Sequence, residues 1–304
     1  MSAPRPVCRF APEWGCVALI GLIDLVWAHA IGFRLVVVPT DFIMAAGASA
    51  LWIAARKLHS ERGALVMEFI CLSLAGVVFE IFSYLAMGSA SGPLWDAPFL
   101  AADRALGFDW LALYNWVTAQ PILGFTLHVL YVSIVVQAFI AGIVLGLRGE
   151  RQRMADLYRI VSLASLITCI GAMYFPALGP FKVFAVEGRG AYLPDMEHLL
   201  THQNLTFHLS QLTGVVTFPS FHVVVALAYA WGLRHAGRFG RVMVVLNLAM
   251  LPSIPVYGGH YLVDAIAGAA VMLVSLGIIK AIPMLARRLA ASAQSAPVSA
   301  SAGL

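Results

Sequence analysis

Apolar residues gather in long stretches that short polar or basic segments separate. One helix of about 20 apolar residues crosses the hydrocarbon core of a bilayer. Eight stretches approach this length, at residues 14–33, 35–55, 64–87, 122–147, 157–176, 214–233, 242–257 and 260–284. The pattern therefore predicts an all-α fold, a polytopic membrane helical bundle with about eight transmembrane helices.

The connection between the third and fourth stretches is not a simple polar loop. It reads GPLWDAPFLAADRALGFDWLALYNWVTAQP and interleaves aromatic rings with aspartates. Aromatic side chains favour the headgroup layer, so we expect interfacial helices in the outer linkers. Two interpretations of residues 94–116 are compatible: an anchor in the interface, and a cover that guides a lipid sideways into a site.

Composition supports a membrane location and argues against nucleic acid as a partner. Of 304 residues, 61% are hydrophobic and 11% charged, and the mean hydropathy is +0.87. Soluble domains are about 45–50% apolar and about 25% charged. The net charge is only +4, with the cations in short clusters between apolar stretches. The four cysteines show no disulfide framework or zinc-site spacing.

The basic residues predict the orientation. Fifteen of the nineteen lysines and arginines fall on one side of the predicted spans, and the other side has Arg34, Arg104, Lys182 and Arg189. The positive-inside rule makes the richer side cytoplasmic. We therefore expect a multi-pass protein of the plasma membrane, the inner membrane of a bacterium, with both termini cytoplasmic. Linkers 88–121 and 177–213 then lie outside.

The same pattern divides the chain into four regions. Residues 1–13 are expected to form a cytoplasmic tail and 14–90 a set of N-terminal transmembrane helices. Residues 91–285 contain the polar motifs described below and are interpreted as a catalytic membrane domain. Residues 286–304, rich in Ala and Ser, are expected to be disordered.

The stretch TFPSFHVVVALAYAWGL, residues 217–233, begins with polar residues where leucine would insert at lower cost. Pro219 suits the first turn of a helix. Ser220 and the free backbone amides of that turn form a natural anion site, because a helix N-terminus presents N–H groups. His222 then stands as a titratable group beside this site.

A second polar cluster opens the last predicted span, in VYGGHYLVDAIAGAA. His260 and Asp264 are four residues apart and share one face of a helix. An aspartate can hold one imidazole nitrogen and make the other a better nucleophile. Because a carboxyl inside a span costs about 2.5–3.5 kcal/mol on insertion scales, a functional partner such as His260 is expected.

A third element is GPFKVFAVEGRG, with Lys182 and Arg189 separated by six residues. Lysine and arginine stabilise the charge on the oxygens of a phosphoryl group in transfer. In contrast, no metal site is expected at His198, His202 and His208, because no cysteine or aspartate completes a convincing set of metal ligands with them.

These three motifs resemble the type-2 phosphatidic acid phosphatase superfamily. Its pattern is Lys-x6-Arg-Pro, then Pro-Ser-Gly-His, then Ser-Arg-x5-His-x3-Asp. Lys182 and Arg189 match the first motif, with Gly190 in place of proline. Pro219, Ser220 and His222 match the second motif, with Phe221 in place of glycine, and Ser253, His260 and Asp264 match the third, with Ile254 in place of arginine. ADRALGFDW and YFPALGPF further resemble the branch that contains the inositol phosphorylceramide synthases, which are inositolphosphotransferases of sphingolipid metabolism.

The resemblance implies the roles of these residues and requires no metal or other cofactor. His260 is the nucleophile that becomes a phosphohistidine, and Asp264 orients it. His222 protonates the leaving oxygen and then deprotonates the acceptor. Lys182, Arg189 and Ser220 bind the phosphate oxygens, and Arg104 is a possible substitute for the arginine missing at Ile254.

The leading interpretation is a lipid phosphotransferase that acts at the extracytoplasmic face. Its partners are a phospholipid or lipid-linked phosphate, an alcohol or water as acceptor, and membrane lipids. Two alternatives stay open: a lipid-phosphate phosphatase, and a non-enzymatic transporter or assembly protein. Transporters commonly contain internal repeats, and the sequence contains no evident repeat.

Overall fold

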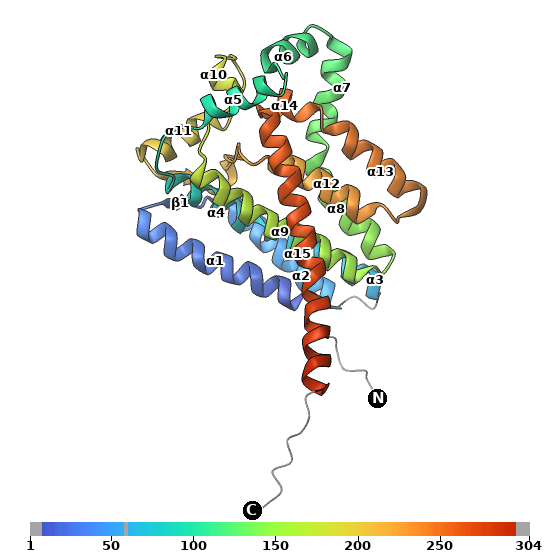
Figure 1. Ribbon diagram of the computed structural model, residues 1–304. Coiled ribbons are helices and arrows are strands. Elements are labelled where there is room, and N and C mark those ends of the chain that lie inside the picture. Colours follow the sequence, from blue (N-terminus) through green and yellow to red (C-terminus); the bar gives the residue numbers. More distant parts are fainter. Residues whose placement is uncertain (1–7, 58–59, 296–304) are drawn as a thin grey trace, which may run out of the picture.

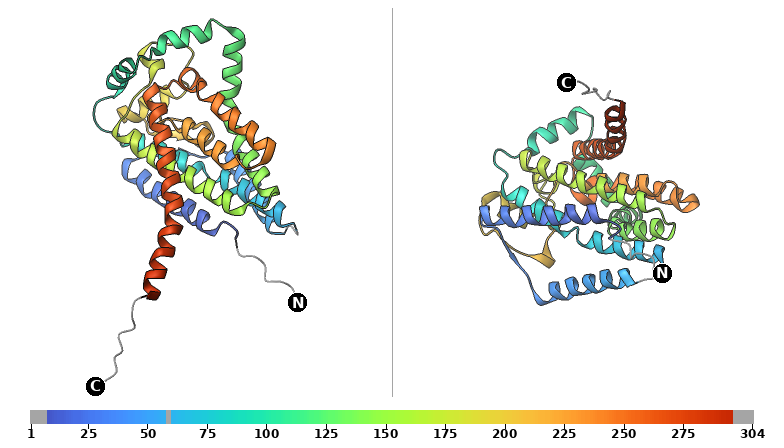
Figure 2. Two further views of the ribbon diagram at one scale, coloured as in Figure 1. Left: turned by 45° about the vertical axis from the view of Figure 1, so that its right-hand side comes forward. Right: turned by 90° about the horizontal axis from the view of Figure 1, so that it is seen from below.

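The protein is a bundle of α-helices in a computed structural model that describes residues 8–57 and 60–295 (Figures 1 and 2). The predicted all-α class is confirmed. The helices are α1 (Ala11–Ile31), α2 (Pro39–Lys57), α3 (Glu61–Leu74), α4 (Val77–Gly88), α5 (Asp96–Ala105), α6 (Trp110–Thr118), α7 (Pro121–Val132), α8 (Ile134–Leu147), α9 (Arg151–Tyr174), α10 (Pro180–Val183), α11 (Leu193–Thr201), α12 (Phe221–Leu233), α13 (Gly237–Met250), α14 (Ser253–Gly258) and α15 (Leu262–Ser295). Two short strands, β1 (Arg34–Val36) and β2 (Thr206–His208), pair in parallel.

The expected number of eight spans is not confirmed. Within the described ranges, four helices are long and apolar enough to cross a membrane: Ala11–Ile31, Glu61–Gly88, Arg151–Tyr174 and Leu262–Ile282. A fifth span results if α7 and α8, bent by 49° at their junction, count as one. The chain is therefore a multi-pass membrane protein with four to five full-length spans.

Two of the predicted spans are shorter in the structure for local reasons. The stretch 214–233 becomes helical only at Phe221, because residues 214–220 form a loop against the start of α15, where the Ser220 amide binds the Asp264 carbonyl at 3.0 Å. The stretch 242–257 is divided into α13 and α14 at Leu251 and Pro252. Proline cannot donate the helical hydrogen bond, and it restricts the residue before it.

The core forms where α3, α8, α9, α12 and α15 meet. Leu72, Leu145, Ile160 and Val224 are fully buried in it. A Cβ at Gly146 would lie 2.5 Å from a side-chain carbon of Val66, so α3 and α8 can approach closely only because this residue has no side chain. The helix α12, apolar on all sides, packs against α8, α9, α13 and α15. It is thus a buried central helix.

Basic connections gather at one end of the bundle, which we call the basic end. Arg9 pairs with Glu61 at 2.8 Å, and the Arg151 guanidinium donates to the Arg9 carbonyl at 2.8 Å. Arg148 reaches the His235 carbonyl at 3.4 Å, which brings the α8–α9 and α12–α13 connections together. His222 lies at the opposite end of α12, whose 13 residues span about 20 Å.

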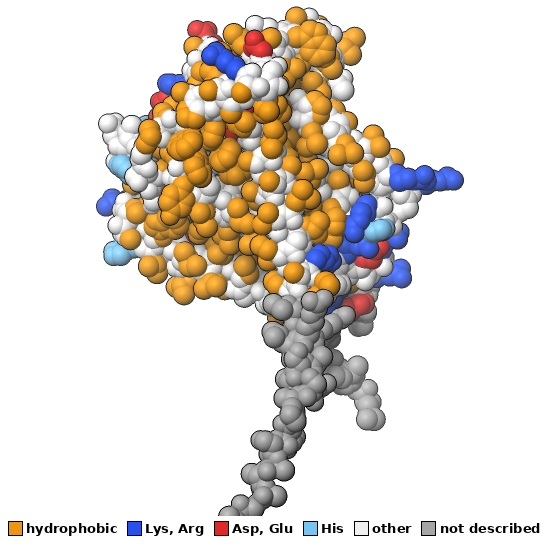
Figure 3. All heavy atoms as spheres, in the orientation of Figure 1, with side chains coloured by type: hydrophobic (Ala, Val, Ile, Leu, Met, Phe, Trp, Pro, Cys, Tyr) orange, Lys and Arg blue, Asp and Glu red, His pale blue; other side chains and the backbone are white. Residues whose placement is uncertain are grey.

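The surface and the end of the chain fit a membrane bundle. Hydrophobic side chains cover a broad band of the face in Figure 3, and Lys and Arg gather at its lower right edge. The last helix, α15, continues to Ser295 beyond the other helices (Figure 2), into the segment 286–304 for which we expect disorder. Residues 296–304 and the first part of the predicted N-terminal tail, 1–7, lie outside the described residues.

Candidate active site

The two motif histidines lie together at a cavity. His222 is the second residue of α12, and His260 lies in the connection between α14 and α15. Their ring centroids are 6.2 Å apart. Both rings line a cavity of about 500 Å³, together with Tyr131, Phe181 and Tyr257. The structure thus unites two polar motifs that are 38 residues apart in the chain.

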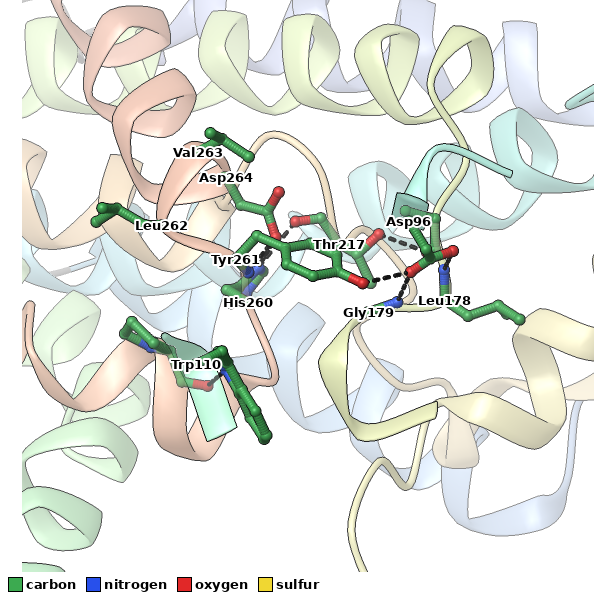
Figure 4. A network of polar contacts seen from close by, with 12 residues as sticks. Asp96, Trp110, Leu178, Gly179, Thr217, His260, Tyr261, Leu262, Val263 and Asp264 are labelled. Atoms are coloured by element: carbon green, nitrogen blue, oxygen red, sulfur yellow. Dashed lines mark hydrogen bonds and ion pairs between the residues drawn. The ribbon is translucent and has the colours of Figure 1, made fainter. Parts of the chain in front are cut away.

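His260 is held in one orientation by the loop before α12 (Figure 4). Its Nδ1 lies 2.8 Å from the Thr217 carbonyl oxygen and 3.4 Å from Oδ2 of Asp264. A carbonyl only accepts, so this bond assigns the proton to Nδ1 and leaves Nε2 with a lone pair. The closer orienting group is therefore a backbone carbonyl, which the motif does not reveal. The predicted partner, Asp264, is the more distant one.

Asp264 connects the two histidine segments. Its Oδ2 accepts the Tyr261 amide at 2.8 Å, and its backbone carbonyl accepts the Ser220 amide at 3.0 Å. A Cβ at Gly268 would lie 2.3 Å from the Ser220 carbonyl oxygen. Glycine is required at that position because any side chain would separate α15 from the start of α12, and with it His260 from His222.

Ser220 and Tyr131 complete the surroundings of His222. Ser220 is fully buried at the N-cap of α12, and its Oγ has no hydrogen-bond partner among the described residues. The ring of Tyr131, from α7, stacks on His222 with centroids 4.6 Å apart. Sequence reasoning missed Tyr131, because no motif connects residue 131 with residue 222.

The two predicted phosphate-binding cations do not line the cavity themselves, but each is adjacent in the chain to a residue that does. Lys182, in α10, is exposed, and its Nζ is 2.6 Å from Oε1 of Glu197. Arg189 lies over the ring of Tyr257, with its guanidinium carbon 5.4 Å from the centroid. Tyr257 and Gly190 line the cavity. The fold thus brings Arg189 beside the cavity, whereas the described contact of the Lys182 ammonium is with Glu197.

The aromatic linker contributes a buried carboxylate through Asp103, next to the predicted Arg104. Arg104 is exposed on α5. Asp103 is fully buried, and its two oxygens accept the Leu262 and Val263 amides at 2.8 and 3.0 Å. Burial raises the pKa of the Asp103 carboxyl, and the two backbone N–H groups oppose this shift. Asp103 therefore satisfies the first amides of α15 from a distant helix.

Asp96 and Trp110 attach the same linker at two further points (Figure 4). Asp96 accepts the Leu178 and Gly179 amides at 2.9 and 2.7 Å and the Tyr261 hydroxyl at 3.0 Å. The indole of Trp110 donates to the Pro255 carbonyl at 3.0 Å. These contacts fix helices α5 and α6 to the chain segments before and after His260. Sequence reasoning assigned no role to Asp96 or Asp103.

Removing the buried carboxylate of Asp103, which caps α15, should destabilise the fold more than removing an exposed helix cap. Asp103→Ala is expected to lower the free energy of unfolding by about 2 kcal/mol, since it leaves two buried amides unsatisfied. Asp109→Ala is the matched control, because Asp109 is an exposed N-cap that accepts one amide, from Ala112, at 2.9 Å. Its expected cost is about 0.5–1 kcal/mol. Thermal unfolding in detergent compares the two, and equal shifts would contradict the role of Asp103.

The fold and this site define a multi-pass helical membrane protein with two histidines at one cavity. The chain belongs to the PAP2 superfamily, the type-2 phosphatidic acid phosphatases, whose family model matches residues 97–278. Members of this superfamily are generally phosphatases or phosphotransferases, so the protein has a membrane-type phosphatase or phosphotransferase fold. No curated protein and no solved structure matches the chain.

Proposed function

We propose that the protein is a lipid phosphotransferase that moves a phosphorylated head group between a lipid and an alcohol, as the inositol phosphorylceramide synthase-like branch does. The observation that carries this proposal is the pair of histidines at one cavity, with ring centroids 6.2 Å apart. One ring can serve as nucleophile and the other as acid and base, because both reach the same reacting phosphorus.

The proposed reaction has two steps. Nε2 of His260 attacks phosphorus, the bond from phosphorus to the lipid oxygen breaks, and His222 gives that oxygen a proton. In the second step His222 takes the proton of the acceptor hydroxyl, whose oxygen attacks phosphorus as the bond to Nε2 breaks. The product is a phosphate ester of the acceptor, and both histidines return to their initial states.

The aromatic cover supports an alcohol rather than water as the acceptor. Trp110 stacks on Phe184 and Tyr114, at 5.4 and 5.0 Å, and meets Phe181 edge-on at 5.8 Å. Phe181 lines the cavity, so the linker 94–116 covers one of its walls. Exclusion of water protects a reactive intermediate from hydrolysis.

The experiment supplies the purified protein with a phospholipid radiolabelled at phosphorus, with and without candidate alcohols. Transfer predicts a new labelled ester of the alcohol, formed at the expense of the hydrolysis product. Labelled water-soluble phosphate that no alcohol suppresses, with no new ester, would make hydrolysis the function. If the protein cleaves no phospholipid and no lipid phosphate, the result would favour the alternative of a non-enzymatic transporter or assembly protein.

We propose that Lys182 and Arg189, with Ser220 and the first amides of α12, bind the phosphate oxygens. Loss of one strong electrostatic contact of this kind costs about 10² to 10³ in rate. Lys182→Ala and Arg189→Ala should each lower kcat/KM by that factor and leave the folded protein intact. Arg34→Ala is the control, since Arg34 is another cation of the predicted outer side but lies on β1. Near-normal kcat/KM in both variants would reject this role, and Arg104→Ala tests the possible substitute in the same assay.

We propose that the histidines face outward and the basic end faces the cytoplasm, because the sequence pattern assigns 15 of the 19 cations to the cytoplasmic side. In a cysteine-free background, Glu187→Cys should react with a membrane-impermeant maleimide in intact cells. Arg238→Cys, in the first turn of α13, should react only after lysis. Both positions are exposed, so access is matched. The reverse labelling pattern would overturn the orientation.

A further inference from the structure

The cavity continues past the histidines into the bundle interior, where polar side chains of α4 and α9 line it. We call this part the inner chamber and define it by Glu80, Ser83, Ser162, Ser165 and Thr168. Its depth follows from α9, because a Cβ at Gly171 would lie 2.7 Å from Pro219 at the histidine end. At a rise of 1.5 Å per residue, Thr168 and Ser162 lie about 4 and about 14 Å deeper.

Helices α9 and α4 form the walls of the chamber. Ser162, Ser165 and Thr168 recur every three residues and share one face of α9. Opposite, the chain interrupts its helix between α3 and α4, at Ala75 and Gly76. A Cβ at Gly76 would lie 2.8 Å from the Ser73 carbonyl oxygen, so the break depends on this glycine. Both α3 and α4 precede residues 97–278, so the chamber includes a wall outside the matched region.

Glu80 is the carboxyl group of this chamber. It lies in the first turn of α4, within a membrane span. Its Oε1 is enclosed and has no hydrogen-bond partner among the described residues. A carboxyl in a span is costly, and such a group is a functional candidate when no protein partner compensates it. Glu80 therefore has a free acceptor oxygen in a cavity that also reaches the two histidines.

Two of the four hydroxyls of the chamber already donate their protons within the protein, which leaves their oxygens as acceptors. Thr168 donates to the Ser165 carbonyl at 2.8 Å, and Ser83 donates to the Glu80 carbonyl at 2.7 Å. The chamber thus offers hydrogen-bond acceptors, and the described lining of the cavity contains no lysine or arginine that would bind a phosphate. It suits a neutral group that donates hydrogen bonds.

We infer that the inner chamber binds a second hydroxyl of the acceptor alcohol, with Glu80 accepting its hydrogen bond while the reacting hydroxyl meets the histidines. This inference rests on the proposed transfer function and names its substrate class: alcohols with at least two hydroxyl groups. A site built to bind a hydroxyl rejects analogues that lack it, because its own polar group then stays unpaired.

The test compares matched alcohols in the labelled-phospholipid assay: glycerol with propanol, and hexanediol with hexanol. In the unmodified protein, the KM for the alcohol should be lower by a factor of at least about ten for the polyhydroxylated member of each pair. Glu80→Ala should remove this difference, and Glu80→Gln should reduce it, because the glutamine carbonyl still accepts a hydrogen bond but carries no charge. Hydrolysis without alcohol should stay within twofold, since Glu80 does not touch the reacting atoms.

Asp24→Asn is the matched control. Asp24 is a buried carboxylate of α1 whose oxygens also have no partner among the described residues, but it does not line the cavity. This variant should keep the discrimination. Equal KM values within each pair in the unmodified protein, or an unchanged difference in both Glu80 variants, would overturn the inference. Loss of hydrolysis without alcohol in folded Glu80→Gln would also overturn it.

A binding measurement separates this inference from the proposed function. If the unmodified protein forms no ester with any alcohol, the transfer proposal fails. The chamber then remains supported only if glycerol or hexanediol raises the thermal unfolding temperature of the unmodified protein and not of Glu80→Ala. No such rise would overturn the chamber as well.

Discussion

Replacement of His260 by alanine should abolish turnover, with kcat/KM reduced by on the order of 10⁴-fold or more, as expected when a covalent nucleophile is removed. The protein should still insert and purify normally, because the Ser220 amide keeps the Asp264 carbonyl and the Thr217 hydroxyl keeps the Ala177 carbonyl. His260 is 3% exposed and lines the cavity, so alanine enlarges an existing cavity and creates no separate void.

The measurement is single-turnover kinetics with a labelled phospholipid, followed by detection of acid-labile, base-stable label on the protein. The unmodified protein should carry this label, which is typical of a phosphoramidate, and His260→Ala should not. Thermal unfolding in detergent serves as the folding control. A well-folded His260→Ala variant with normal activity would reject the phosphohistidine mechanism.

Replacement of His222 by alanine should have the second largest effect, a loss of about 10²- to 10⁴-fold, which is the usual contribution of general acid–base catalysis. The loss should be smaller for a donor with a good leaving group, because such a group departs without a proton. The structural reason is that His222 lies across the cavity from His260 and is stacked on Tyr131.

Two donors that differ in the pKa of the leaving alcohol, such as a natural phospholipid and a nitrophenyl phosphate ester, separate the two roles of this residue. With the activated donor, the His222→Ala protein should accumulate label on His260. The intermediate still forms, because this donor needs no proton, but the acceptor is no longer deprotonated. Tyr131→Phe is a control that keeps the stacked ring. Equal losses with both donors and no trapped label would contradict the assignment of His222 as the acid.

The local chemistry of the site was accessible from the sequence. Each histidine has its companion residues within four positions, Ser220 beside His222 and Asp264 after His260. Helical periodicity therefore predicts which side chains share a face. The hydropathy of the chain likewise predicted the membrane class, because a hydrocarbon solvent requires long apolar stretches whatever their order.

The carboxylates that fix the aromatic linker illustrate what such local rules leave out. Asp103 caps Leu262 from 159 residues away, and Asp96 binds Tyr261 from 165 residues away. In the sequence both aspartates are indistinguishable from the solvated charges of a loop. Their partners are backbone amides and a hydroxyl, which carry no residue pattern by which to recognise them.

The sequence by itself determined the all-α membrane class, the two histidine motifs and their resemblance to the type-2 phosphatidic acid phosphatase superfamily. Each of these rests on composition or on residues about one helical turn apart. Only the tertiary structure decided the number of full spans, the carbonyl of Thr217 as the nearest partner of His260, and the cavity that joins both histidines to Glu80. These features depend on how helices bend, end and pack. The physical reason is that packing and long-range hydrogen bonds join residues whose separation along the chain has no fixed period.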